Sequence, residues 1–115
     1  MSFLGMFKDR RSISDINEMV EKAREQKDAV LLDVRTREEY AGGHIGGSVN
    51  LPLDKIDSVR TIIHKKDTPL YVYCHSGSRS GRACKQLRAM GYKGAVNIGG
   101  ICSWRGEIKT EERPL

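Results

Sequence analysis

The feature that most constrains the fold is an alternation of short apolar runs with segments of helical spacing. Residues 29–34 are almost continuously apolar, which is typical of a parallel strand covered on both faces. Residues 48–51, 70–73 and 95–98 are further strand patterns bounded by turn residues. We expect a three-layer α/β fold around a central parallel sheet of four to five strands, with ligands beyond the carboxyl ends of the strands.

Helical patterns occupy the intervals between these runs. Ser14 is the expected N-cap of a helix that reaches about Arg24, with Ile13 before it as a hydrophobic staple. A sharp turn is expected at Gly99-Gly100. The other helices are expected at residues 37–41, from a cap at Asp54 through about 63, at 80–90 and at 101–105.

Length and composition indicate one globular domain over residues 1–115, with frayed ends at about 1–11 and 106–115. The chain is 38% hydrophobic and 30% charged, and no apolar run approaches the roughly 20 residues that span a bilayer. The first residues make a poor secretory signal, so we expect a cytoplasmic protein with no membrane partner. The net charge of +5 is scattered, which favours a solvated surface or mild attraction of anions, and no motif indicates nucleic-acid binding.

The three cysteines, Cys74, Cys84 and Cys102, are widely spaced and include no C-x-x-C pair. This spacing supports neither a disulfide framework nor a four-ligand zinc site, and no metal is expected. Cys84 is expected to have a structural or surface role. For Cys102, packing is favoured and a resolving thiol is the alternative.

The segment with a chemical signature begins where Cys74 closes a buried strand. Small and polar residues follow, which allow the backbone to curl so that successive N–H groups point inward as a nest. The N-terminus of the next helix and the cation of Arg79 add positive potential, which lowers the pKa of a thiol and makes it nucleophilic. The expected site comprises Cys74 as the nucleophile with His75, Ser76, Gly77, Ser78, Arg79 and Ser80 around it.

Four motifs occur in order along the chain. They are Leu32-Asp33-Val34-Arg35 with Glu39-Tyr40, the segment Gly43–Pro52, the loop Cys74–Ser80, and Asn97–Ile101 with Trp104. Together they resemble the signatures of the rhodanese family, single-domain thiosulfate sulfurtransferases, over most of the chain.

The resemblance implies that Cys74 takes sulfane sulfur from a donor such as thiosulfate and forms a persulfide cradled by the loop amides. Cyanide or a thiol then removes the sulfur in a ping-pong cycle without a cofactor. A protein sulfur acceptor is a further candidate partner. Two positions depart from the family pattern. His75 stands where a basic residue is common, which leaves less positive charge for thiosulfate, and Gly46 stands where proline is common.

Asp33 and Arg35 are expected to support the site. Asp33 could pair with Arg79 and orient the loop, or could be an ordinary charge at a strand end. Arg35 and Glu39 are four residues apart, which favours a surface pair over substrate contact.

The two histidines near the motifs have different expectations. His44 is expected to bond its ring nitrogen to the backbone. For His75, tuning of the mouth of the site and simple exposure to solvent remain open.

Two other functions are considered. Cysteine-dependent phosphatases place five residues between the nucleophile and the arginine, whereas here Cys74 and Arg79 are separated by four, which favours sulfur over the larger phosphate. A persulfide carrier that serves a protein partner is the other alternative, and the intact loop does not distinguish a carrier from an independent enzyme.

Overall fold

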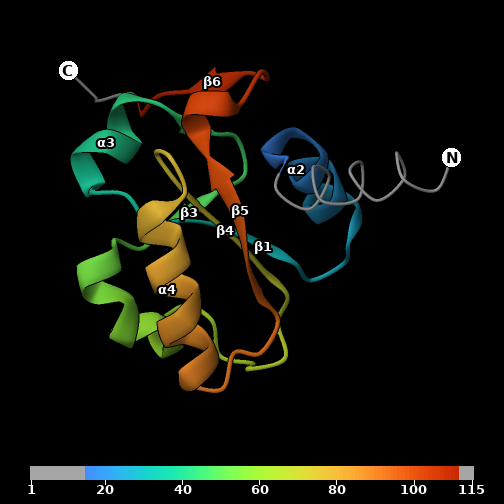
Figure 1. Ribbon diagram of the computed structural model, residues 1–115, viewed down its shortest axis with the longest axis vertical. Helices are drawn as coiled ribbons and strands as arrows, with labels where there is room; N and C mark the ends of the chain where they lie inside the picture. Colours follow the sequence, from blue (N-terminus) through green and yellow to red (C-terminus); the bar gives the residue numbers. More distant parts are fainter. Residues whose placement is uncertain (1–14, 112–115) are drawn as a thin grey trace, which may run out of the picture.

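The computed structural model describes residues 15–111 and contains a four-stranded parallel sheet in the order β3-β1-β4-β5 (Figure 1). The strands are β1 (Val30–Asp33), β3 (Val49–Asn50), β4 (Leu70–Cys74) and β5 (Ala95–Gly100). A separate antiparallel pair joins β2 (His44–Ile45) to β6 (Ile108–Lys109). The expected α/β fold with a central parallel sheet is confirmed.

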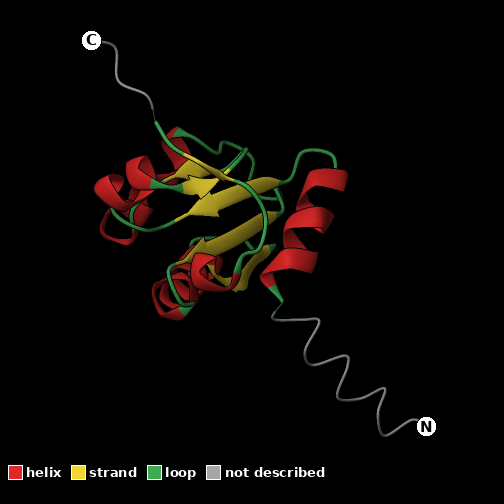
Figure 2. Cartoon of the chain, turned by 90° about the horizontal axis from the view of Figure 1, so that it is seen from above, coloured by secondary structure: helices red, strands yellow, loops and turns green. Residues whose placement is uncertain are grey.

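Helices cover both faces of the sheet and complete three layers (Figure 2). One face carries α2 (Ile16–Glu25). The other carries the 3-10 helix η1 (Leu53–Thr61) and α4 (Ser78–Ala89). Two short elements, α3 (Arg37–Gly42) and the 3-10 helix η2 (Ile101–Ser103), follow β1 and β5 at their carboxyl ends.

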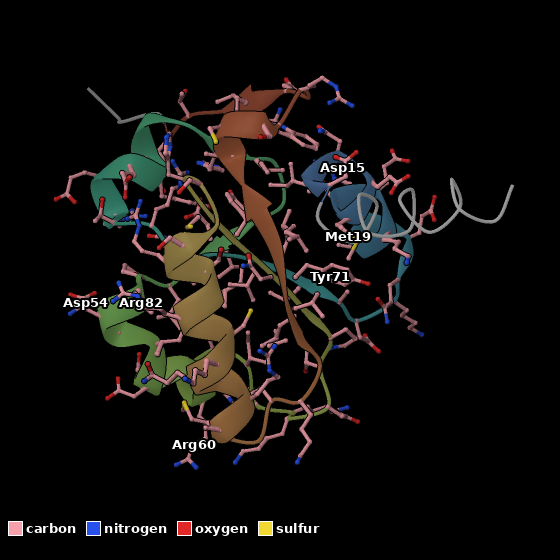
Figure 3. The ribbon with its side chains drawn as sticks, in the orientation of Figure 1. Asp15, Met19, Asp54, Arg60, Tyr71 and Arg82 are labelled. Carbon is pink, nitrogen blue, oxygen red and sulfur yellow. The ribbon has the colours of Figure 1, made fainter. Side chains whose placement is uncertain are left out.

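The sheet divides the core into two clusters because alternate strand residues point to opposite faces. On β4, Tyr71 and Tyr73 face the α2 layer, whereas Val72 and Cys74 face the layer of α4 and η1. Tyr71 lies on the side of the sheet that faces α2 (Figure 3). Its hydroxyl donates a hydrogen bond to Gln26 Oε1 at 2.5 Å, which connects β4 to the end of α2. Cys74 therefore belongs to the same packed layer as α4.

Two helix starts differ from the prediction. The N-cap of α2 is Asp15, whose carboxylate accepts a hydrogen bond from the Asn17 N–H at 2.9 Å. Ser14 and Ile13 lie outside the described residues. Asp54 does not cap a helix, because η1 already begins at Leu53, and Asp54 lies in its first turn.

The start of α4 matters most for function, because the helix begins at Ser78 and not at Ser80. Gly77 precedes it with a φ of 110°, a left-handed conformation that glycine adopts without strain. The connection between β4 and α4 is therefore only residues 75–77, and Arg79 and Ser80 belong to the first turn of the helix.

The last part of the chain is more ordered than expected. Gly99 and Gly100 are not a turn but the end of β5, where they pair with Tyr73 and Cys74. The register shifts between Val72 and Tyr73, a local bulge that keeps both glycines in the strand. The expected fraying of 106–115 is wrong for β6, which pairs with β2, and residues 1–11 and 112–115 lie outside the described part.

Within residues 15–111, no helix has the length and apolar character that crossing a membrane requires.

Candidate functional site

Cys74 lies at the carboxyl end of β4, an interior strand of the sheet, with α4 starting four residues later. Its side chain is almost completely buried, at 1% exposure. Among the groups that face the sulfur, the Gly77 N–H donates to Sγ at 3.0 Å, and the Ser80 Oγ lies 3.4 Å from it. The loop thus aims hydrogen-bond donors at a single sulfur atom.

These contacts set the ionisation of the thiol. Burial raises the pKa of Cys74, since a charged sulfur loses its hydration. The Ser80 hydroxyl and the backbone N–H groups of Ser80, Gly77 and Ser76 favour the thiolate and more than offset burial, so the pKa is lowered from its ordinary value. A thiolate is the nucleophilic form of cysteine. The nest expected from the sequence is therefore present around Cys74.

The loop is held tightly against β5. A Cβ at Gly100 would overlap the carbonyl oxygen of His75 and the Cα of Ser76. The backbone N–H of Cys102 donates to the same His75 carbonyl at 3.1 Å. The strand and η2 together therefore form the wall that fixes the curl of the loop.

Arg79 is not a free cation at the mouth of the site. Its guanidinium makes a bidentate pair with Glu39 of α3, at 2.7 and 3.1 Å. The same Glu39 accepts the Thr36 N–H at 2.8 Å in a capping box, so its carboxylate is fixed from two sides. The hydrogen bond from Arg79 lowers the pKa of Glu39 to about 2.

This pairing corrects two expectations about the supporting residues. Asp33 does not pair with Arg79, and Arg35 does not pair with Glu39. Instead Asp33 and Arg35 pair with each other at 2.7 Å in the interior, with side chains 0% and 7% exposed. The local geometry decides the partner, because Asp33 also accepts the Arg35 backbone N–H at 2.9 Å two residues along the chain.

The buried pair connects several segments at the carboxyl edge of the sheet. Arg35 Nη2 also donates to the Gly43 carbonyl at 2.7 Å. Asn50 on β3 donates to the carbonyls of both Asp33 and Arg35 at 3.0 Å. Asp33 and Arg35 therefore support the edge on which the loop lies, and neither is hydrogen-bonded to Cys74.

His44 meets its expectation. Its Nδ1 lies 2.7 Å from the Tyr40 carbonyl, and its ring stacks on the Tyr40 ring at 3.8 Å between centroids. His75, in contrast, is exposed in the loop, as is Ser76, and Ser78 is exposed at the start of α4.

The other two cysteines differ in their surroundings. Cys84 is buried on α4, and burial raises its pKa to about 11, in keeping with the expected structural role. Cys102 was expected to pack, but it is exposed because η2 carries it over the end of β5 and out of the core.

Two site contacts are made by residues to which the sequence assigned no such contact. Asn97 on β5 accepts a hydrogen bond from the Ser80 hydroxyl at 2.7 Å and donates to the Gly77 carbonyl at 3.0 Å. The sequence feature that could have indicated this role is the position of Asn97, a polar residue inside an apolar strand shortly before the glycine pair. Glu39 could have been noticed as the last residue of the capping box that starts at Thr36.

No cluster of three or more histidine, cysteine or acidic residues suited to holding a metal occurs in the described range 15–111.

Comparison with known proteins agrees with this geometry. The family model described as Rhodanese-like domain matches residues 16–107. The uncharacterized protein YqhL of Bacillus subtilis is 41% identical over 85 residues, covering 73% of this chain and 67% of that protein. The thiosulfate sulfurtransferase PspE of Escherichia coli is 37% identical over 71 residues, covering 61% of this chain and 68% of that protein.

A rhodanese-like domain protein from Staphylococcus aureus has a similar structure, with a TM-score of 0.73 at 32% identity, covering 85% of this chain and 96% of that one. Some relatives are much longer. The chain spans 23% of the adenylyltransferase and sulfurtransferase uba4 of Ogataea parapolymorpha and 43% of the putative sulfur carrier protein YrkF of Bacillus subtilis.

The family match covers most of the chain, and the relative YqhL is 41% identical over 73% of it. The chain therefore belongs to the rhodanese-like domain family.

Proposed function

We propose that this protein is a sulfurtransferase that carries sulfane sulfur as a persulfide on Cys74. The thiolate of Cys74 attacks the outer sulfur of a donor such as thiosulfate. The sulfur–sulfur bond of the donor breaks, sulfite leaves with the bonding electrons, and a Cys74 persulfide remains. An acceptor such as cyanide or a thiol then attacks the terminal sulfur, and the Cys74 thiolate leaves.

The observation that carries the proposal is the convergence of donors on the Cys74 sulfur. The Gly77 N–H at 3.0 Å and the Ser80 hydroxyl at 3.4 Å both favour an anionic sulfur over a neutral thiol. The same donors can stabilise the anionic persulfide, whose charge also resides on sulfur. His75, Ser76, Ser78 and Arg79 border this nest and are proposed to contact the incoming donor or acceptor.

The short loop supports sulfur rather than phosphate as the group transferred. Only residues 75–77 separate β4 from α4, and the loop closes on β5 at Gly100. A phosphoryl group has three outer oxygens that each need donors, so it requires a wider ring of N–H groups than one sulfur atom does.

A protein acceptor is the second candidate for the physiological partner. The relative YrkF is named as a putative sulfur carrier protein, and uba4 as an adenylyltransferase and sulfurtransferase. In such a carrier role the Cys74 persulfide would form in the same way, but a partner protein would discharge it faster than cyanide.

Intact mass after thiosulfate treatment tests the proposal. We expect the wild type to gain one sulfur atom and to produce thiocyanate when cyanide is added. Cys74→Ser should lose both, whereas Cys102→Ser, which removes the exposed thiol, should retain both. Near-normal thiocyanate production by Cys74→Ser would refute the assignment of Cys74.

A further inference from the structure

The Ser80 hydroxyl carries a single proton. Ser80 is completely buried, and three acceptors lie within reach of its Oγ. Asn97 Oδ1 is at 2.7 Å, Cys74 Sγ at 3.4 Å and the Gly99 carbonyl at 3.5 Å. A hydroxyl donates only one hydrogen, so these acceptors compete for it.

The orientation of the Asn97 amide makes it a permanent competitor. Its Oδ1 also accepts the Gly99 N–H at 3.0 Å, and its Nδ2 donates to the Gly77 carbonyl at 3.0 Å. Reversing the amide would place its NH2 group against the Gly99 N–H, and its oxygen against the Gly77 carbonyl oxygen. The oxygen of Asn97 therefore always faces Ser80, which has to be the donor between them.

The charge on Cys74 changes which acceptor prevails. A neutral sulfur is a weak acceptor, and the short bond to Asn97 then holds the hydrogen. An anionic sulfur accepts a charge-assisted bond, which is roughly twice as strong as a neutral one. The hydroxyl can reach it by rotation alone, because Oγ is already 3.4 Å from Sγ.

We propose that Asn97 is a positioning residue of the sulfur site, which competes with Cys74 for the Ser80 hydrogen and so limits how strongly Ser80 stabilises the anionic sulfur. The hydroxyl bonds Asn97 when Cys74 is neutral and turns to the sulfur when Cys74 is a thiolate or a persulfide anion. Asn97 makes no hydrogen bond to the sulfur itself and acts through Ser80. The inference deepens the proposed function, since it concerns the same sulfur.

Other titratable or charged groups lie near the loop and have to stay constant in a test. They are His75 in the loop, Arg79 on α4, Glu39 on α3, Asp33 and Arg35 at the end of β1, Tyr73 on β4 and Cys102 on η2. Arg79 with Glu39 and Asp33 with Arg35 form neutral pairs. None of these residues is changed in the variants below except Cys102, which is replaced in every protein compared.

The test is a four-protein cycle of Asn97→Ala, Ser80→Ala, the double variant and their parent, all with Cys102→Ser to remove the exposed thiol. The rate of Cys74 alkylation by iodoacetamide is measured against pH. Asn97→Ala should lower the pH of the inflection in this profile by roughly 0.5 to 1 pH unit, which corresponds to the net free energy of one hydrogen bond. Ser80→Ala should raise it, and Asn97→Ala should then have no further effect.

A purely structural role for Asn97 gives the opposite sign. Loss of its bond to the Gly77 carbonyl would misalign the Gly77 N–H and raise the inflection, whether or not Ser80 is present. An upward or absent shift in Asn97→Ala, or an equal downward shift in the Ser80→Ala background, would overturn the proposal. Asn97 is exposed on β5, and Asn97→Ser, whose shorter side chain also lacks the amide, provides a second variant with the same expected direction.

Alkylation requires no sulfur donor, so this experiment is independent of sulfur transfer. A negative alkylation result would overturn the role of Asn97 and would not affect the proposal of a Cys74 persulfide. Failure of thiosulfate to load Cys74 would overturn the proposed function and would not affect the interpretation of the alkylation profile.

Discussion

Among single residues, the pair between Arg79 and Glu39 decides how much positive charge the site offers to an anionic donor. Both side chains are about one-third exposed, at 30% and 36%, and the carboxylate holds the guanidinium with two hydrogen bonds. Since His75 stands where a permanent cation is common, Arg79 is the residue of the segment 74–80 whose fixed positive charge can attract thiosulfate. Its pairing reduces the attraction that a dianion would feel.

We therefore expect Glu39→Gln to lower the KM for thiosulfate by several-fold. Glutamine can still accept the Thr36 N–H in the capping box, so α3 should persist while Arg79 loses its charged partner. The exposed pair contributes only about 0.2–1 kcal/mol to folding, so the free energy of unfolding should change little. Steady-state thiocyanate production at low salt measures the effect.

Glu111→Gln is the matched control, because Glu111 also makes a bidentate pair with an arginine, Arg37 on the same helix. This control should leave KM unchanged. A higher KM in Glu39→Gln would mean that Glu39 holds Arg79 in the pose that the donor requires, contrary to the prediction.

Sequence reasoning at this scale found single residues with strong local signals and missed their partners. Cys74 is recognisable from the strand that it ends and the small residues that follow. The backbone bond of His44 follows from its turn. The partner of Arg79 was missed because its pair with Glu39 depends on how α3 and α4 approach the edge of the sheet, and no local pattern encodes that approach. The pair of Asp33 with Arg35 is local, but the helical spacing of Arg35 and Glu39 favoured a different partner for Arg35.

At the scale of elements, the loop after β4 depends on how closely β5 approaches it. The four parallel strands were predictable from apolar runs, but the start of α4 was not. Gly77 turns the chain with a positive φ, and the polar residues Ser78 and Arg79 show no apolar periodicity. The pairing of Gly99 and Gly100 with β4 also depends on the bulge near Tyr73, which a strand pattern does not reveal.

Gly100→Ala adds only one methyl group, but we expect it to disrupt the site. Gly100 has an ordinary extended conformation, with φ of −131°, so alanine causes no backbone strain there. Its Cβ would instead overlap backbone atoms of His75 and Ser76, which cannot move without changing the curl of the loop. We expect at least a tenfold loss of thiocyanate production and a higher pH for the inflection of Cys74 alkylation.

Gly42→Ala provides the comparison, since a Cβ at Gly42, the last residue of α3, would meet no atom within 4 Å. Alanine is also favoured over glycine in helices. This variant should keep wild-type activity. Equal activity of the two alanine variants would show that the contact between β5 and the loop does not shape the site.

For the molecule as a whole, the buried pair of Asp33 and Arg35 joins the segments that meet at the carboxyl edge. Arg35 reaches the Gly43 carbonyl beyond α3, and Asn50 of β3 reaches the carbonyls of both paired residues. One interior ion pair thus connects β3, at the edge of the sheet, with the residue that follows α3. The pair was hidden from sequence reasoning, since arginine at such a position is ordinarily a surface residue.

Arg35→Leu should be strongly destabilising, by about 3–5 kcal/mol, because it leaves the carboxylate of Asp33 buried without a counter-charge. Such a loss is a large part of the 5–15 kcal/mol that typically separates a native domain from its unfolded chain. Arg37→Leu is the control, because Arg37 is the first residue of α3 and its pair with Glu111 is exposed, with the Arg37 side chain 64% accessible. This variant should lower the free energy of unfolding by less than about 1 kcal/mol. Urea unfolding measures both, and similar midpoints for the two variants would show that the interior pair does not hold the edge. Replacing Asp33 as well, in Asp33→Leu with Arg35→Leu, should recover part of the lost stability, because no unpaired charge then remains in the interior.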